Sequence, residues 1–392
     1  VRTLARLALA PPALADVWRR DAIGEGEIGT PPRDRLARVV GRARFVAPVR
    51  PPVPLALPPE SPDREPRSDV DMVRIVTDAG STVDLLTASA PRAWPRWAEI
   101  DEPASAWGLP LAAGGGPRPA GPAGERWPDA APARVLAAPR VAWQAPGLAG
   151  EAGMDAGLFD RVADGRRLTA DDADAFFALL SAAGVAGEGR IAAAAGPPRS
   201  IIPLIDPSER WFERHRGDAL AIQGTALRAT RIEIDDPVRR RQTGLDHYWE
   251  VFVFVPTPPI EVAGRIQDRY PVVCCLRGLP AGMPTGPSIG EQIRVAGFAF
   301  KSYAYPLPRG DGPAVRREAP LLVGGDVEWL RPAPAGGGGT LGAVLAGLAT
   351  LVGAGVAFAA WRGSRDARRR DRLRRGGLPG RVVLPGNGPP DG

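Results

Sequence analysis

The predicted architecture depends on residues 340–361, TLGAVLAGLATLVGAGVAFAAW. The segment contains no charged residue. A helix of about 22 residues that rises about 1.5 Å per residue is roughly 33 Å long, enough to cross a hydrocarbon core. The segment 332–339, which ends in four glycines, precedes it, and eight arginines follow between Arg362 and Arg375. We therefore predict a glycine-rich hinge and one transmembrane helix, the alternative being a buried core helix.

The arginine-rich segment 362–392 predicts the orientation in the membrane. Nine of the 50 basic residues and three of the 44 acidic residues lie in it, which leaves 41 of each in the rest of the chain. The positive-inside rule places this tail in the cytoplasm, so we predict a single-pass membrane protein with an extracytoplasmic N-terminal part. Because that part is neutral, it lacks the positive excess of a phosphate-binding protein, and we expect no nucleic-acid partner.

Residues 1–35 form a separate N-terminal segment. Val1–Ala15 contains two early arginines and a short apolar stretch that Pro11 and Pro12 interrupt. This is the outline of a signal peptide with a weak apolar region. We expect it to be the remnant of an export signal, or the true start to lie upstream.

Two parts of the chain have the composition of short β-strands, and a helical connector separates them. In residues 36–145, the segments 36–46, 72–77 and 82–87 have strand composition, the last two flanking a turn. In the connector, 146–215, Thr169 and Asp172 imitate a capping box in front of an apolar stripe. In residues 216–331, the strand segments are 220–234, 248–255, 271–276, 295–305 and 320–329.

The two β-rich parts repeat one pattern. At a shift of 189 residues, Pro91–Pro95 aligns with Pro280–Pro284, and Gly108 aligns with Gly297. Each part ends in an apolar strand closed by a tryptophan, which is Trp143 in the first and Trp329 in the second. We interpret these matches as two diverged copies of one small β-module.

The predicted fold class is mainly β with a helical connector. At a different shift, Gly41 aligns with Gly224, and a glycine inside a first strand lets that strand bend sharply around a barrel. About five short strands per copy are typical of small closed barrels such as the OB-fold. We predict two small OB-like β-barrel modules plus the C-terminal transmembrane helix, with an open sandwich as the alternative to a barrel.

Several motifs resemble those of a known group of proteins. They are Asp101–Gly108 (DEPASAWG), Pro91–Pro95 (PRAWP), Leu279–Gly286 (LPAGMPTG) and Gly297–Tyr303 (GFAFKSY). They resemble uncharacterised single-pass membrane proteins of planctomycete-type bacteria with tandem OB-like β-modules, over most of residues 67–330. The resemblance implies a membrane location and little more, so no functional residue is carried over from it.

Little in the sequence indicates catalysis or metal binding. Gly286–Gly290 (GPSIG) matches the G-x-S-x-G motif of serine hydrolases, but prolines crowd it and both histidines precede Ser288. Lys301 offers a base for that serine, yet nothing marks it as desolvated. Cys274 and Cys275 are neighbours, which point to opposite faces of a strand, and we expect two small buried hydrophobes. We predict no catalytic residue, no metal site and no cofactor.

The aromatic residues of 248–305 are the candidates for ligand binding. Asp246 and His247 also offer an acid next to an imidazole. Strand alternation divides residues 248–254 between the two faces of the strand. One face carries Tyr248, Glu250, Phe252 and Phe254, and the other carries Trp249, Val251 and Val253. The predicted ligand-binding residues are His247, Trp249, Phe298 and Tyr303.

The leading functional hypothesis is a non-enzymatic, membrane-anchored scaffold or interaction protein of the cell envelope. Its expected partners are the lipid bilayer through residues 340–361, an unknown envelope protein, and a second copy through small residues four apart, such as Gly342 and Ala346. The alternative is a ligand-binding module that holds a glycan or peptide on its aromatic β-face. A hydrolase that uses Ser288 is the third hypothesis.

Overall fold

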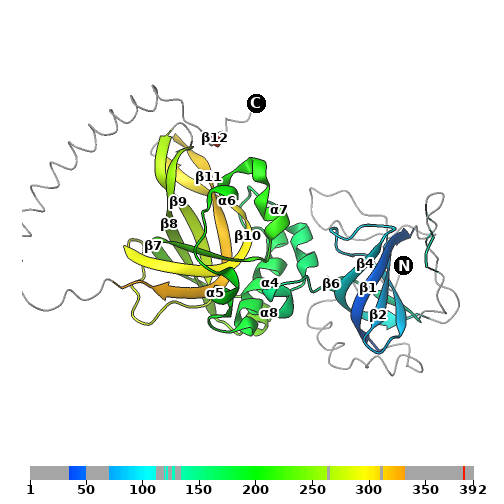
Figure 1. Cartoon of the computed structure of the whole chain (residues 1–392). Coiled ribbons are helices and arrows are strands. Elements are labelled where there is room, and N and C mark those ends of the chain that lie inside the picture. Colours follow the sequence, from blue (N-terminus) through cyan, green and yellow to red (C-terminus); the bar gives the residue numbers. More distant parts are fainter. Residues whose placement is uncertain are drawn as a thin grey trace, which may run out of the picture.

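The computed structural model describes residues 35–49, 70–111, 134–262, 265–309 and 312–331, together with 119, 121, 126–128 and 383–384. It consists of two β-barrels with a group of helices between them (Figure 1). The predicted hinge, transmembrane segment and most of the basic tail lie outside the described residues, as do residues 1–34. Within the described ranges, no helix combines the length and the apolar character that crossing a membrane requires.

The first barrel contains five strands that close on themselves. They are β1 (Ala37–Val49), β2 (Val70–Thr77), β3 (Thr82–Thr87), β4 (Glu99–Pro110) and β5 (Arg134–Ala138). The order around the ring is β1-β2-β3-β5-β4, and β4 pairs back with β1. Only β3 and β5 are parallel among these neighbours. The short β6 (Val141–Trp143) pairs with another part of β4.

The second barrel has the same topology. Its strands are β7 (Ala219–Glu233), β8 (His247–Val262), β9 (Arg265–Leu276), β10 (Glu291–Arg309) and β11 (Gly312–Trp329). They form the ring β7-β8-β9-β11-β10, with β9 and β11 parallel. The helix α8 (Pro237–Thr243) joins β7 to β8, and β12 (Val383–Leu384) pairs with the end of β8. The prediction of a mainly β chain with an OB-like closed barrel is confirmed.

The first strand of each barrel has a glycine where the ring is tight. A Cβ atom on Gly41 would lie 2.3 Å from the carbonyl oxygen of Val76, and one on Gly224 would lie 2.4 Å from the carbonyl oxygen of Phe254. Real side chains do not approach a backbone carbonyl so closely, so only glycine fits. In each strand a β-bulge follows shortly after the glycine, between residues 43 and 45 and between residues 226 and 228.

The closing tryptophans also make equivalent contacts. The indole Nε1 of Trp143 donates to Glu102 Oε2 at 2.8 Å, and that of Trp329 donates to Glu291 Oε2 at 2.8 Å. Glu102 and Glu291 are related by the 189-residue shift of the sequence repeat. The register of β4 against β1 also recurs in β10 against β7, because Gly41 pairs with Ala104 and Gly224 pairs with Ile293.

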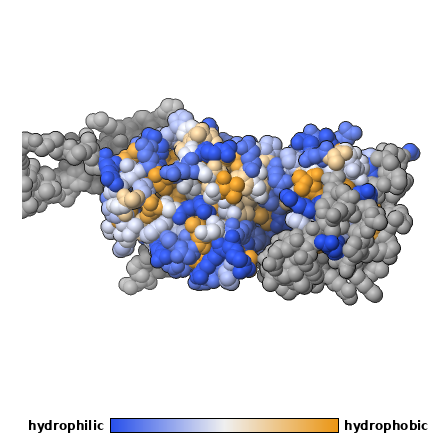
Figure 2. Space-filling view, turned by 90° about the horizontal axis from the view of Figure 1, so that it is seen from below, coloured by the Kyte–Doolittle hydropathy of each residue, from blue (hydrophilic) through white to orange (hydrophobic). Residues whose placement is uncertain are grey.

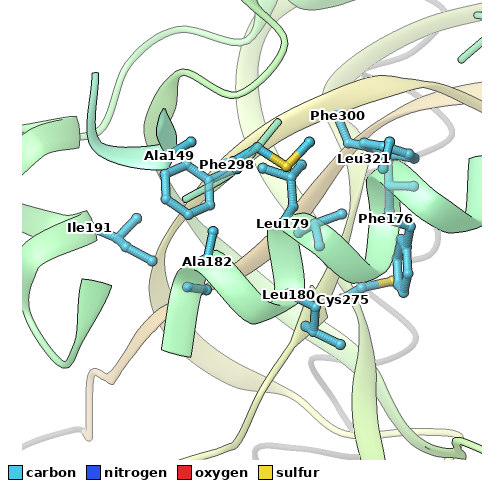
Figure 3. Packing of buried hydrophobic residues seen from close by; sticks show 14 of the residues in the cluster. Ala149, Phe176, Leu179, Leu180, Ala182, Ile191, Cys275, Phe298, Phe300 and Leu321 are labelled. Carbon is cyan, nitrogen blue, oxygen red and sulfur yellow. The ribbon is translucent and has the colours of Figure 1, made fainter. Parts of the chain in front are cut away.

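The helical connector packs on the outside of the second barrel. It contains α3 (Leu148–Glu151), η2 (Ala156–Arg161), α4 (Ala170–Ala186), α5 (Arg190–Ala195), α6 (Ile202–Ile205), η3 (Pro207–Glu209) and α7 (Trp211–His215). In Figure 3, Leu179 and Ala182 of α4 lie beside Phe298 of β10, and Phe176 lies near Leu321 of β11. Phe298 and Phe300 are therefore fully buried, although they point away from the barrel interior. The sheet supplies an apolar outer face, and the helices cover it.

The connector also contacts the first barrel. The Asp155 side chain accepts hydrogen bonds from the backbone N–H of Trp143 and of Gly157, each at 2.9 Å. It also pairs with Arg140. Asp155 thereby caps η2 and holds the end of the first barrel against it.

Candidate functional site

The outer face of β8 has the alternation that the sequence predicts. Val251 and Val253 are fully buried inside the second barrel, and Trp249 packs against the same interior cluster. Tyr248 and Phe252 point outward and pack against the cluster beneath the helices. They are only half-buried, because the helices cover part of this face and leave the rest open.

Three aromatic rings meet on the open part of this face. Phe252 of β8 contacts Tyr305 of β10 edge to face, with ring centroids 5.8 Å apart and planes at 86°. Tyr303, two residues before Tyr305 on the same strand, stacks on it at 6.4 Å with planes at 20°. All three side chains are half-buried, so each has one side against the protein and another toward solvent.

An arginine completes the group. The guanidinium carbon of Arg228 lies 4.0 Å from the centroid of the Phe252 ring, a cation–π contact. The same guanidinium donates to Glu250 Oε1 at 2.7 Å. Arg228 reaches this position because it directly follows the β-bulge of β7 and pairs with Phe252 across the strands. We call Arg228, Glu250, Phe252, Tyr303 and Tyr305 the outer cluster.

The electrostatics around the outer cluster are mixed, with a modest basic contribution. Burial raises the pKa of Tyr303 and of Tyr305 above its usual value, while a nearby guanidinium opposes the shift in each case, Arg167 for the first and Arg317 for the second. Both phenols are therefore neutral near pH 7. Neutral rings flanked by guanidinium groups can stack planar groups of a ligand and balance a neighbouring negative charge.

The structure does not bring the four predicted ligand-binding residues together. Phe298 is fully buried under the helices, so no ligand reaches it. Trp249 packs against the barrel interior. His247 lies at the start of β8, where its Nδ1 contacts Asp246 and lies 3.2 Å from an Arg231 nitrogen. Only Tyr303 belongs to the outer cluster.

The acid beside His247 is part of a surface contact. The hydrogen bond with His247 lowers the pKa of Asp246, and Arg231 adds to the effect. Asp246 is exposed, and its neighbours are these two basic side chains. Asp246, His247 and Arg231 therefore form a contact at the protein surface.

The hydrolase hypothesis lacks its base. Ser288 is exposed in the loop between β9 and β10. Nothing in the sequence marks Lys301 as desolvated, but in the structure it is fully buried and its Nζ lies 2.9 Å from Asp172 Oδ1. Burial lowers the pKa of Lys301, and the hydrogen bond with Asp172 opposes that change. A buried, paired ammonium cannot serve an exposed serine.

Metal binding receives no support from the described part of the chain. In those residues, no group of three or more histidine, cysteine, aspartate or glutamate side chains is placed to hold a metal ion. Cys274 and Cys275 are free and buried, Cys274 inside the barrel and Cys275 on its outer side. Burial raises the pKa of each thiol, so neither is a thiolate near pH 7.

Sequence reasoning missed Arg228, which is central to the outer cluster. The available signal was its place four residues after Gly224, because a bulge that follows the barrel glycine redirects the next side chain. The surface around the helices and the second barrel is otherwise varied. On the coloured part of the face in Figure 2, hydrophobic residues form small patches that hydrophilic residues separate.

Comparison with known proteins gives structural neighbours only. No family model and no curated protein matches the sequence. The chain is similar to a single-stranded-DNA-binding protein of Plasmodium falciparum solved with single-stranded DNA, at 9% identity over 29% of this chain and 94% of that one, with a TM-score of 0.18. It is also similar to the mitochondrial single-stranded-DNA-binding protein Rim1 of S. cerevisiae, at 12% identity over 30% of this chain and 98% of that one, with a TM-score of 0.16.

The predicted partners need one correction. Both neighbours are single-stranded-DNA-binding proteins, and the exclusion of nucleic acid that we drew from the neutral charge balance is withdrawn. Net charge over residues 1–361 describes the average surface and says nothing about one face of one barrel. The envelope protein and the second copy are given up as partners with that prediction, and residues 340–361 lie outside the described residues.

Proposed function

We propose that this chain is a non-enzymatic binding protein whose second barrel holds single-stranded nucleic acid on the outer cluster. In this proposal the chain carries two OB-like modules on a C-terminal membrane anchor. The observation that supports it best is the half-open stack of Tyr303 and Tyr305 beside the Arg228–Phe252 pair.

The position of the outer cluster supports binding. OB-folds hold oligonucleotides and oligosaccharides on the face of their second and third strands. In the second barrel these strands are β8 and β9. Phe252 lies on the outer face of β8, and Tyr305 of β10 contacts it there. The position of the outer cluster beside the second strand of the barrel therefore supports ligand binding.

The chemistry of the outer cluster favours bases over sugars. Two nearly parallel tyrosine rings along one strand offer successive stacking surfaces, and each stacked base contributes about 1–3 kcal/mol. Arg228 is paired with one carboxylate, but its side chain remains 42% exposed and can also meet a phosphate. With few guanidinium groups present, we expect weak binding with a shallow salt dependence.

Fluorescence anisotropy with a labelled 12-nucleotide strand tests the proposal. The full chain in a zwitterionic detergent is titrated at low and moderate salt, with the matching duplex as competitor. We expect saturable binding of the single strand, and a loss of about 5- to 100-fold for Tyr303→Ala or Tyr305→Ala, because each removes about one stacking contact.

The matched control is Trp107→Ala in the first barrel. Trp107 is also a half-buried aromatic with an arginine, Arg38, 5.6 Å from its centroid. Its removal should leave nucleic-acid binding unchanged. If no single strand binds at about 100 µM chain, or if the tyrosine variants bind as the native chain does, the proposal is wrong. Binding of a glycan that depends on the same tyrosines would move the function to the glycan alternative.

A further inference from the structure

Three outward-facing residues form a row across the first barrel. Phe45 on β1 pairs with Arg74 on β2, and Arg74 pairs with Asp84 on β3. Arg74 and Asp84 make a two-pronged ion pair, with Nε 2.8 Å from Oδ1 and an Nη 3.0 Å from Oδ2. Both side chains are buried, although they lie on the outside of the barrel. Something must therefore cover them.

Trp127 covers the row. Its ring centroid is 5.0 Å from the Arg74 guanidinium carbon and 5.4 Å from the Phe45 ring, which meets it edge to face at 90°. Its indole Nε1 donates to Asp84 Oδ2 at 3.3 Å, and the next residue, Pro128, accepts from Arg74 at 2.6 Å. A cation, an aromatic ring and a carboxylate acceptor thus hold one planar ring that has an N–H donor.

This row is the counterpart of the outer cluster. Phe45 and Arg228 each follow the bulge of the first strand in their barrel. Their partners on the second strand are Arg74 and Phe252. In the first barrel the aromatic residue is on the first strand and the arginine on the second, and in the second barrel the two are exchanged. Both pairs occupy the same position on their barrel. In the second barrel this place is half-open, whereas in the first Trp127 fills it.

We propose that Phe45, Arg74 and Asp84 form a second ring-binding site and that Trp127 is its internal occupant. The ligand is a planar heteroaromatic ring with an N–H donor on its edge, such as a nucleobase. We expect the ligand's ring to be neutral, because Asp84 already balances the charge of Arg74. The ligand class is shared with the proposed function, so this inference rests on it in part, but the site lies on the other barrel.

Trp127 competes with such a ligand from within the same chain. A tethered group acts at an effective concentration in the millimolar range. The native chain therefore binds single rings weakly at this site, and removal of the indole should expose it. Binding to the site is consequently a gain in the variant, which general damage to the protein does not produce.

The test is calorimetric titration of the full-length Trp127→Ala chain in detergent with three probes. Indole and guanosine have N–H donors, and caffeine is a planar ring without one. We expect indole and guanosine to bind at least about tenfold more tightly than to the native chain, with caffeine weaker than both. The control Trp107→Ala should show no gain.

Two results would overturn the inference. One is a Trp127→Ala chain with native circular dichroism that binds none of the rings better than the native chain. If that variant does not fold, the native chain is followed by NMR through its Trp127 indole signal, which is assigned by its loss in Trp127→Phe. The second result that would overturn the inference is a Trp127 indole signal that stays unchanged in about 10 mM guanosine.

The two proposals fail separately. Tyr303→Ala does not touch the first barrel, so Trp127→Ala combined with Tyr303→Ala should still gain indole binding. A chain that gains indole binding but never binds an oligonucleotide would refute the proposed function and keep the ring site. If the chain binds oligonucleotide through Tyr303 but Trp127→Ala gains no indole binding, the ring site is refuted and the proposed function is kept.

Discussion

Lys301 and Asp172 form a fully buried ion pair that joins the helical connector to the second barrel, with Nζ 2.9 Å from Oδ1 and 3.0 Å from Oδ2. The Asp172 carboxylate also accepts from the backbone N–H of Thr169 at 2.9 Å and from its hydroxyl at 3.1 Å. One carboxylate therefore caps the first turn of α4 and neutralises the only lysine of the chain. Position and orientation of α4 on the barrel depend on both contacts.

We predict unequal costs for removing the two partners of this pair. Loss of one member of a buried ion pair costs about 3–5 kcal/mol, because the other charge stays buried. Lys301→Met leaves Asp172 with its two Thr169 donors. Asp172→Ala leaves a buried ammonium with only the long 3.5 Å contact to the Arg167 carbonyl, and it removes the helix cap. The urea unfolding free energy should therefore fall more for Asp172→Ala.

A surface pair provides the comparison for that measurement. Arg210 and Glu213 form an ion pair with side chains 71% and 44% exposed. Glu213→Ala should change the unfolding free energy by less than about 1 kcal/mol. The interpretation fails if Lys301→Met is as harmless as Glu213→Ala, or if the double variant of Lys301 and Asp172 costs the full sum of the two single variants.

The barrel glycines give a second prediction. Gly41→Ala and Gly224→Ala each place a methyl group against a backbone carbonyl, at 2.3 Å and 2.4 Å before relaxation. Overpacking of this kind costs about 1–3 kcal/mol or more, and here the clashing atom is backbone and cannot rotate away. Gly278→Ala is the control, since nothing lies within 4 Å of its added Cβ. If thermal unfolding shows that Gly278→Ala loses as much stability as the other two variants, the tight barrel geometry is contradicted.

The closing tryptophans allow one prediction to be made twice. Trp143→Phe and Trp329→Phe each remove an indole donor from a glutamate at 2.8 Å while keeping an aromatic ring. A hydrogen bond to a charged group contributes about 1.5–3 kcal/mol, and somewhat less at these half-buried sites. We expect similar losses of stability in both barrels, measured by chemical denaturation. An effect confined to one barrel would show that the two contacts are not equivalent.

Strand composition predicted most of the fold but not β4. The segments around Val73, Leu85, Val253 and Val273 have β-branched and apolar residues, and they are strands in the structure. In β4 the sequence EIDEPASAWGLP contains acids, a proline and a glycine, which local propensity assigns to a loop. Pairing with β1 makes it a strand, and only the repeat with β10 indicated this.

The site was predicted less well, because burial depends on elements far apart in the sequence. Alternation placed Phe252 on the same face of its strand as Tyr248, and in the structure both lie on the outer face. Alternation cannot say what covers that face, and so it retained Phe298, which α4 buries. Arg228 and Trp127 act through bulge geometry and through a contact made across 43 residues to Asp84. Trp127 leaves no local pattern, and Arg228 leaves only its spacing from Gly224.

Alkaline pH should destabilise the second barrel through Tyr270. Burial raises the pKa of Tyr270 to about 12, and its hydroxyl donates to the carbonyl of Glu318 at 2.8 Å. The unfolded side chain titrates near about 10, so above that pH the unfolded chain loses the proton first. The stabilisation is thus complete below about pH 10 and is lost toward pH 12, by about 2–3 kcal/mol.

Tyr270→Phe isolates that contribution. Its cost at pH 7 is only the lost hydrogen bond, about 1 kcal/mol. Its unfolding free energy should then fall less steeply than that of the native chain between pH 10 and 12. Burial also raises the pKa of Tyr305 and of both cysteines, but these groups are present in both proteins and contribute to both curves. If the unfolding free energies of the two proteins fall in parallel across that pH interval, Tyr270 does not contribute to the alkaline destabilisation.

The membrane anchor is a prediction from sequence that decides where the barrels meet a ligand. A chain that ends at Arg331 should stay in the supernatant after carbonate extraction, whereas the full chain should sediment with membranes, because only the latter has the apolar segment 340–361. Protease added outside intact spheroplasts should then cleave the barrels and spare the arginine tail. Sedimentation of the truncated chain would refute the predicted anchor, and protection of the whole chain would show the opposite orientation.

In the opposite, reversed orientation the outer cluster faces the cytoplasm, where single-stranded nucleic acid is plentiful. In the predicted orientation it meets only strands outside the cell, so oligonucleotide affinity and topology must be measured on the same full-length protein.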